Sequence, residues 1–220
     1  LSPQELAARI KAEAAHLGFS LVGIAPAARP DTLDFLHDWL NRGMHGEMGY
    51  MSRRKDAYAH PSGVMPEVRS LILLSMNYSN EQSSDSATGR IAKYATGETD
   101  YHDLMRSRLK SLVRMLREAF PESRNRVIVD TAPLLERDFA RKAGLGWFGK
   151  NTLLINKYEG SYFFLAGILT DLELPADSPH ETSHCGTCTR CLDACPTDAF
   201  DGPYTLDARK CISYLTIELR

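Results

Sequence analysis

Residues 185–220 hold all five cysteines of the chain, and four of them form one closely spaced run. The run reads Cys185-Gly-Thr-Cys188-Thr-Arg-Cys191-Leu-Asp-Ala-Cys195-Pro196, which is C-x2-C-x2-C-x3-C-P. This spacing is typical of [4Fe–4S] sites, because a tight turn brings three thiolates within reach of one cluster while the fourth usually ligates a second cluster. We therefore predict a pair of clusters and one-electron transfer.

The ligand set for this pair is incomplete within the chain. Cys185, Cys188 and Cys191 are predicted ligands of the first cluster, and Cys195 and Cys211 of the second. Each cluster needs four thiolates, so two clusters need more than the five cysteines of this chain. A further cysteine run should therefore follow, and we expect the chain to be part of a longer protein.

A zinc site is the competing interpretation, because His180, His184 and Cys185 are also possible zinc ligands. Zinc sites usually separate two cysteine pairs by a loop, whereas here three close steps run together, which favours the cluster. Disulfides are disfavoured, since an odd, crowded cysteine set without a signal peptide indicates a reducing compartment.

Composition excludes several other classes. The chain has 220 residues, of which 43% are hydrophobic and 25% charged, which suits one large core with a small appended module. We predict a first domain at 1–176 and an iron–sulfur module at 177–220.

The net charge of −2 gives no global basic field, so any RNA contact needs a local patch. No apolar run is long enough to span a bilayer, and we expect a cytoplasmic protein without a membrane partner.

Apolar periodicity and turn signals predict a mixture of helices and strands. The predicted helices are Pro3–Leu17, behind a Ser2 capping box, Thr32–Arg42, Asp100–Phe120 and Pro133–Ala143. The predicted strands are Leu21–Ala25, Leu71–Met76 and Arg126–Asp130, with a hairpin joining Thr152–Ile155 to Tyr162–Leu169. Gly43–His60 and Ser79–Gly89 are predicted loops. We expect an α+β fold with layered α/β character.

Several further motifs occur in a fixed order. They are Asp100-Tyr101-His102, Val129-Asp130-Thr131-Ala132-Pro133-Leu134-Leu135-Glu136-Arg137, Ala143-Gly144-Leu145-Gly146-Trp147-Phe148-Gly149-Lys150-Asn151-Thr152 and Asp207-Ala208-Arg209-Lys210-Cys211. Together with the cysteine run they closely resemble the epoxyqueuosine reductases.

The resemblance implies the last step of queuosine biosynthesis, in which the epoxide of epoxyqueuosine at the wobble position of tRNA is reduced to an alkene. It implies cobalamin and two [4Fe–4S] clusters as cofactors, and a catalytic domain related to that of reductive dehalogenases. The implied partners are tRNA that carries epoxyqueuosine and an electron donor that the sequence does not identify. In such an enzyme the hard chemistry would belong to the cofactor.

Asp130 is the predicted catalytic acid. By its pattern alone, an aspartate at the end of an apolar strand either donates a proton or caps the helix predicted from Pro133. The matching motif of the family assigns it to proton donation, which requires a covered site that keeps the carboxyl protonated by desolvation. The resemblance also implies cobalamin contacts from Lys93, Tyr94, Asp130, Leu154 and Leu165.

Neighbouring polar residues have competing interpretations. Tyr101 either assists as a donor or is a half-buried aromatic side chain. Glu136 and Asp138 are predicted to lie on a helix surface near its positive N-terminal end. Lys150 either holds corrin amides or ends a turn. A basic stripe on the longest predicted helix faces either tRNA phosphates or solvent; it consists of Arg106, Lys110, Arg114 and Arg117.

Two other functions remain open. One is a different cobalamin and iron–sulfur reductase, such as a dehalogenase, although dehalogenases usually carry a twin-arginine export signal, which is not seen. The other is a ferredoxin-type electron carrier, which would not need the long segment that precedes Cys185.

Overall fold

The computed structural model describes residues 1–78 and 92–219, so the predicted loop at Ser79–Gly89 lies outside the described residues. Its centre is a four-stranded sheet in the order β1-β2-β6-β3, and every neighbouring pair is antiparallel. The strands are β1 (Leu21–Pro26), β2 (Ser70–Asn77), β3 (Asn125–Ile128) and β6 (Phe163–Thr170). The two central strands β2 and β6 are almost entirely buried, which explains their continuous apolar sequences.

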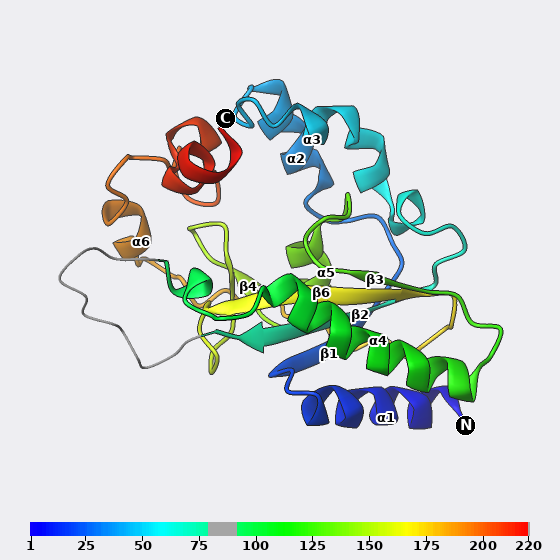
Figure 1. Ribbon diagram of the computed structural model, residues 1–220. Coiled ribbons are helices and arrows are strands. Elements are labelled where there is room, and N and C mark those ends of the chain that lie inside the picture. Colours follow the sequence, from blue (N-terminus) through cyan, green and yellow to red (C-terminus); the bar gives the residue numbers. More distant parts are fainter. Residues whose placement is uncertain (79–91, 220) are drawn as a thin grey trace.

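Two long helices cover one face of the sheet, α1 (Pro3–His16) and α4 (Tyr101–Ala119) (Figure 1). The capping box of α1 forms as predicted, because the backbone N–H of Glu5 donates to Ser2 Oγ at 3.2 Å while the Glu5 carboxylate accepts from Ser2 N at 2.7 Å. The apolar stripes of both helices pack on alternate side chains of β2 and β6 to form one core; its fully buried members include Ile10, Ile72, Leu109 and Ile168.

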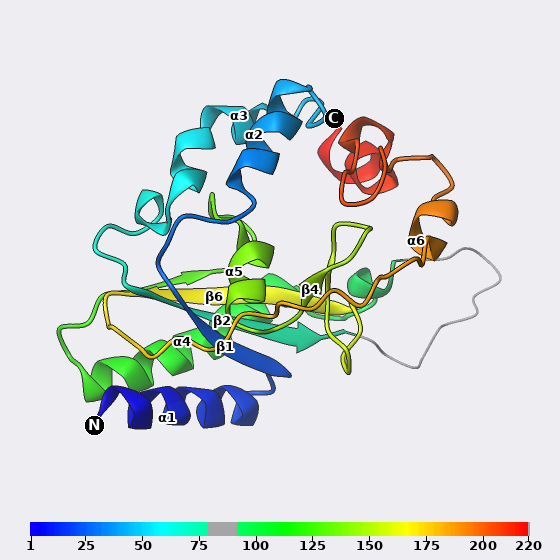
Figure 2. The same ribbon diagram turned by 180° about the vertical axis from the view of Figure 1, so that it is seen from behind.

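Shorter elements cover the opposite face, as the reverse view shows (Figure 2). They are α2 (Leu33–Asn41), α3 (Gly49–Arg53), the 3-10 helix Lys55–Ala59 and α5 (Glu136–Lys142), with a small two-stranded sheet of β4 (Trp147–Phe148) and β5 (Leu154–Ile155). Phe139 of α5 is fully buried in the second core, against Leu71 and Leu169 of the main sheet. The α+β class is therefore as predicted.

Three predicted elements were wrong. Residues 152–155 and 162–169 do not form a hairpin, because β5 pairs with β4 whereas β6 joins the central sheet between β2 and β3. The predicted loop Gly43–His60 contains α3 and a 3-10 helix. The helix predicted from Pro133 begins only at Glu136.

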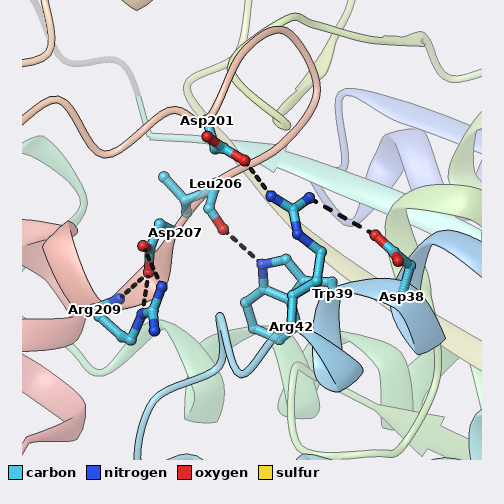
Figure 3. A network of polar contacts seen from close by, with 7 residues as sticks. All are labelled: Asp38, Trp39, Arg42, Asp201, Leu206, Asp207 and Arg209. Carbon is cyan, nitrogen blue, oxygen red and sulfur yellow. Dashed lines mark hydrogen bonds and ion pairs between the residues drawn. The ribbon is translucent and has the colours of Figure 1, made fainter.

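The cysteine-bearing segment is a chain of short turns with α6 (Arg190–Asp193), the 3-10 helix Ala208–Lys210 and the π-helix Tyr214–Glu218. It docks on α2, where Trp39 Nε1 donates to the Leu206 carbonyl at 2.6 Å and Arg42 pairs with Asp201 (Figure 3). The Arg209 guanidinium neutralises the buried Asp207 at 2.8 Å beside this contact. None of the helices in residues 1–78 and 92–219 is long and apolar enough to cross a membrane.

Candidate active site at the end of β3

Asp130 lies two residues beyond the end of β3, beside the first turn of α4. Its Oδ2 accepts a hydrogen bond from Tyr101 Oη at 2.7 Å and contacts His102 Nε2 at 2.8 Å. The other histidine nitrogen, Nδ1, contacts Asp100 Oδ1 at 2.7 Å. Tyr101 and His102 of the Asp-Tyr-His motif therefore converge on Asp130, and Asp100 orients His102 from the other side of its ring. A positioned acid requires such an arrangement.

The helix start positions this motif. Asp100 is the N-cap of α4, and its side chain accepts from the backbone N–H of His102 at 2.8 Å. The cap thereby fixes the helix end that carries Tyr101 and His102, and the end of β3 brings Asp130 to them. Sequence reasoning predicted Asp130 and considered Tyr101, but it gave no role to His102.

The carboxylates of Asp100 and Asp130 raise the pKa of the neighbouring His102 and Tyr101 side chains. Desolvation lowers the pKa of His102, but its hydrogen bonds to the Asp100 and Asp130 carboxylates outweigh this effect, so that its pKa lies above the ordinary value. Burial first, and then the Asp130 hydrogen bond, raise the pKa of Tyr101 far enough that it keeps its proton. Tyr101 Oη and His102 Nε2 thus both contact the same oxygen, Asp130 Oδ2.

The backbone of Asp130 is strained, with φ at 47° in the left-handed region that non-glycine residues rarely adopt. The alternative role as a helix cap is not realised, because the N-cap residue of α5 is Leu135 and it makes no side-chain cap hydrogen bond. The strained turn instead directs the carboxyl towards Tyr101 and His102. Strain of this kind occurs at functional sites.

An aromatic wall adjoins this acid. The Tyr101 ring stacks on Phe164 with 3.8 Å between centroids and 4° between planes, and Tyr78 packs against Phe164 at 4.5 Å. These rings line a pocket of about 160 Å³ together with Lys93 and Tyr94. Two of the residues predicted to bind cobalamin therefore lie next to Tyr101.

The fit of these residues to cobalamin is partial. The pocket is smaller than the roughly 300 Å³ at which sites for drug-sized ligands begin, so Lys93 and Tyr94 would contact only part of a corrin. Leu165 is half-buried and lies on the opposite face of β6 from Phe164, while Leu154 is 3% exposed in the second core. An apolar floor and a polar rim suit a corrin with amide side chains, but the structure does not gather all five predicted residues in one place.

Two acidic residues differ from their predicted surface positions. Asp138 is 1% exposed, and its Oδ2 accepts from the backbone N–H of Thr32 at 2.7 Å and from its Oγ1 at 2.8 Å. Glu136 is half-buried, and burial first, then the nearby Asp130 charge, raise its pKa to about 8. Contacts with distant segments explain both differences: Asp138 is held by Thr32, and Glu136 lies near Asp130.

The cysteines lie on the docked C-terminal segment, and all five are free thiols. The backbone N–H of Ala199 donates to Cys195 Sγ at 3.3 Å and, with Thr197, lowers the pKa of that thiol, as a ligand thiolate requires. Within residues 1–78 and 92–219, no three His, Cys, Asp or Glu side chains gather closely enough to hold a single metal ion.

Two groups of contacts tie this segment to the rest of the chain near Cys185. Lys150 Nζ donates to the carbonyls of Gly186 at 2.7 Å and Cys188 at 2.9 Å, so it holds the cluster-binding loop. His180 and His184, the possible zinc ligands, pack on Trp147 with centroids 5.5 Å and 4.7 Å away.

The basic stripe of α4 is largely exposed. Lys110, Arg114 and Arg117 line a hollow of about 580 Å³ between α4 and the edge strand β3, whereas Arg106 lies 3.9 Å from Asp103. The hollow lies at the far end of α4 from Tyr101. A contact with RNA at this stripe stays a prediction.

Family models match two parts of the chain. Residues 59–131 match the model described as "Epoxyqueuosine reductase QueG, DUF1730", and residues 184–220 match a 4Fe-4S double cluster binding domain. The chain is 46% identical over 214 residues to an epoxyqueuosine reductase of Cyclobacterium marinum, covering 96% of this chain and 69% of that protein. It is 43% identical to the epoxyqueuosine reductase of Escherichia coli, over all of this chain and 59% of that one.

Solved structures agree with the sequence relatives. One crystal structure of an epoxyqueuosine reductase superposes with a TM-score of 0.87 at 30% identity, covering 96% of this chain and 57% of that one. A second, bound to an epoxyqueuosine-modified tRNA stem loop, gives 0.84 at 29% identity over the same shares. The catabolic reductive dehalogenase NpRdhA shares the fold, with a TM-score of 0.52 at 19% identity. The chain spans 57% of each of the two solved epoxyqueuosine reductases and 23% of the dehalogenase.

Proposed function

The chain belongs to the epoxyqueuosine reductase family, and we propose that it forms the catalytic part of an enzyme that reduces epoxyqueuosine to queuosine in tRNA. The observation that carries this proposal is the convergence of Tyr101 and His102 on the strained Asp130. A related structure bound to a modified stem loop supports tRNA as the substrate.

The reaction determines what the protein must supply. Converting an epoxide to an alkene breaks both C–O bonds, forms a C=C bond and releases the oxygen as water, which consumes two electrons and two protons. Cobalamin, when bound, would supply the two-electron chemistry at carbon, and the clusters would deliver electrons one at a time. The residues of this chain must place the acid against the epoxide oxygen and hold the protons.

The proposed roles follow from the geometry. His102 holds a proton at Nε2, next to Asp130 Oδ2, before the reaction. Asp130 donates this proton to the epoxide oxygen, and the pair takes up a new proton afterwards. Tyr101 fixes Asp130 Oδ2 by its hydrogen bond and presents its ring to the pocket wall. Lys93 and Tyr94, which line the pocket, are proposed cobalamin contacts together with Asp130. Leu154 and Leu165 are proposed as cobalamin contacts from the family resemblance alone.

We divide the chain at 176/177 into the catalytic domain and the iron–sulfur module. Cys185, Cys188 and Cys191 would ligate one cluster and Cys195 and Cys211 the other. Electrons would come from a donor that remains to be identified. We propose that the enzyme works in the cytoplasm, where tRNA is modified and thiols stay reduced.

The test is single-turnover reduction of an epoxyqueuosine-containing stem-loop RNA by the full-length protein, loaded with clusters and cobalamin and given a strong reductant. Nucleoside analysis should show queuosine with the wild-type protein. Asp130→Asn should slow the reaction about 10²- to 10⁴-fold while the cobalamin and cluster absorption bands persist. The matched control is Asp34→Asn, which changes an exposed carboxylate on α2.

Two results would count against the proposal. If the loaded wild-type protein leaves the epoxide intact, the assigned reaction is wrong. If Asp130→Asn and Asp34→Asn react at the wild-type rate, the assigned acid is wrong.

A further inference from the structure

Glu136 carries a buried carboxyl that the roles above do not use. It is the first residue of α5, and its Oε1 is buried with no hydrogen-bond partner among residues 1–78 and 92–219. A glutamate at a helix start is normally ionised and exposed, because the positive end of the helix dipole favours the negative charge. A buried carboxylate with one oxygen left unpaired is costly, whereas a protonated carboxyl avoids much of that cost.

The groups around Glu136 explain its protonation. Burial is the largest effect and the Asp130 carboxylate is the second, and both favour the neutral form. The backbone N–H of Asp130 and the charge of Arg137 act in the opposite direction but are weaker, and the resulting pKa is about 8. Tyr58, from the 3-10 helix Lys55–Ala59, also faces this carboxyl, and its own pKa is raised, first by burial. Glu136 therefore carries a proton at neutral pH.

The chemistry needs such a second proton. Removal of the epoxide oxygen as water takes two protons, and the His102–Asp130 pair holds only one between its two facing atoms. The first proton is used when the first C–O bond opens, and the second when the remaining C–O bond breaks. A site that encloses the nucleoside and the corrin also excludes the water that would otherwise provide it.

We propose that Glu136 stores the second proton of the deoxygenation and passes it to Asp130 after Asp130 has given up the first. This inference rests on the proposed function, since it assigns the source of a proton in that reaction. Proton balance is complete: the His102–Asp130 pair and Glu136 each lose one proton, the oxygen leaves as water, and solvent reloads both groups after the product departs. Departing hydroxide is a much stronger base than either carboxylate, so the transfer is downhill.

Glu136 acts through Asp130 and is therefore a positioning residue for the proton. A purely structural role for its carboxyl would predict a changed melting temperature and an unchanged pH profile. A role in binding a corrin amide through the free Oε1 would predict weaker cobalamin affinity. The proposal predicts a changed pH profile with unchanged cobalamin binding, so the three roles differ in what is measured.

The first experiment needs no turnover. Infrared difference spectra between the wild-type protein and Glu136→Gln, recorded from pH 6 to pH 9.5, should contain the C=O stretching band of one protonated carboxylic acid. Its intensity should fall with a midpoint near the pKa of about 8. The control Glu122→Gln changes an exposed glutamate and should leave that band in place. A spectrum without the band at pH 7 would overturn the proposal.

The second experiment is single-turnover reduction of the epoxyqueuosine stem loop across the same pH range, in loaded full-length protein. The wild-type rate should fall above pH 8, whereas Glu136→Gln should react about tenfold more slowly at pH 7 and show no fall near pH 8. Glu136→Asp, which keeps a carboxyl, should restore part of the pH dependence. Parallel profiles for wild type and Glu136→Gln would overturn the relay, whereas failure of the wild-type protein to react would overturn the proposed function itself.

Discussion

Replacing Glu136 by glutamine should stabilise the protein in alkaline solution and change little in acid. The folded state raises the pKa of this carboxyl from 4.5 to about 8, so the folded protein binds the proton more tightly than the unfolded chain. That contribution to stability is fully present below pH 4.5 and is lost as the pH rises towards 8. With ~1.4 kcal/mol for each pKa unit, the shift corresponds to at most about 5 kcal/mol between the two limits. Glutamine keeps the neutral shape and does not titrate.

Paired urea denaturations of wild type and Glu136→Gln from pH 5 to pH 8.5 would measure this difference as a change in midpoint at constant slope. The free energy of unfolding of the variant should exceed the wild-type value by a margin that grows with pH. When wild-type Glu136 and Glu136→Gln are compared in proteins that both carry Asp130→Asn, the difference should grow less with pH. The Asp130→Asn change removes the nearby like charge. Glu122→Gln should run parallel to wild type. A constant difference between Glu136→Gln and wild type across this range would refute the buried, protonated carboxyl.

Three further substitutions test the surrounding structure. Tyr101→Phe removes the donor to Asp130 while keeping the stacked ring, so urea denaturation should show a loss of about 1 kcal/mol and single-turnover reduction should slow. Asp138→Asn weakens the hydrogen bonds from Thr32 and should cost about 1–3 kcal/mol by the same measurement. Gly23→Ala would place a Cβ 2.1 Å from the Ala143 carbonyl oxygen, and urea denaturation should show that the free energy of unfolding falls by about 1–3 kcal/mol.

Local patterns predicted the elements that depend on local interactions. The capping box at Ser2 predicted the start of α1, and the apolar stripe of α4 predicted a helix whose observed bounds are Tyr101–Ala119. Both helices bury one face and expose the other, so periodicity alone carries the information. The fully buried strand β2 was equally clear, because a short continuous apolar run between polar turns has few alternatives.

Pairings between distant segments were not predictable in this way. Residues 152–155 and 162–169 have the composition of a hairpin, but the second segment pairs with β2 and β3 because only the sheet centre buries its whole length. The burial of Glu136 was missed for a similar reason. Tyr58, which interacts electrostatically with Glu136, lies in a segment that was predicted to be a loop and forms a 3-10 helix. Tertiary packing, rather than local propensity, decides both outcomes.

The Asp130 group combines both kinds of information. The Asp-Tyr-His motif and the strand-ending aspartate were each visible in the sequence, but only the packing of β3 against α4 brings the end of β3 to the N-terminus of α4. Protons in this arrangement are held by α4, α5 and the turn after β3, whereas electrons would enter from the cysteine segment that Lys150 fixes through two carbonyls. Because the reaction consumes both, the proposed mechanism requires the two supplies to meet at the epoxide while remaining separate elsewhere. The Lys150 hydrogen bonds to the cysteine segment, and a strained acid near a second, partly unpaired carboxyl, would meet that requirement with residues of this chain.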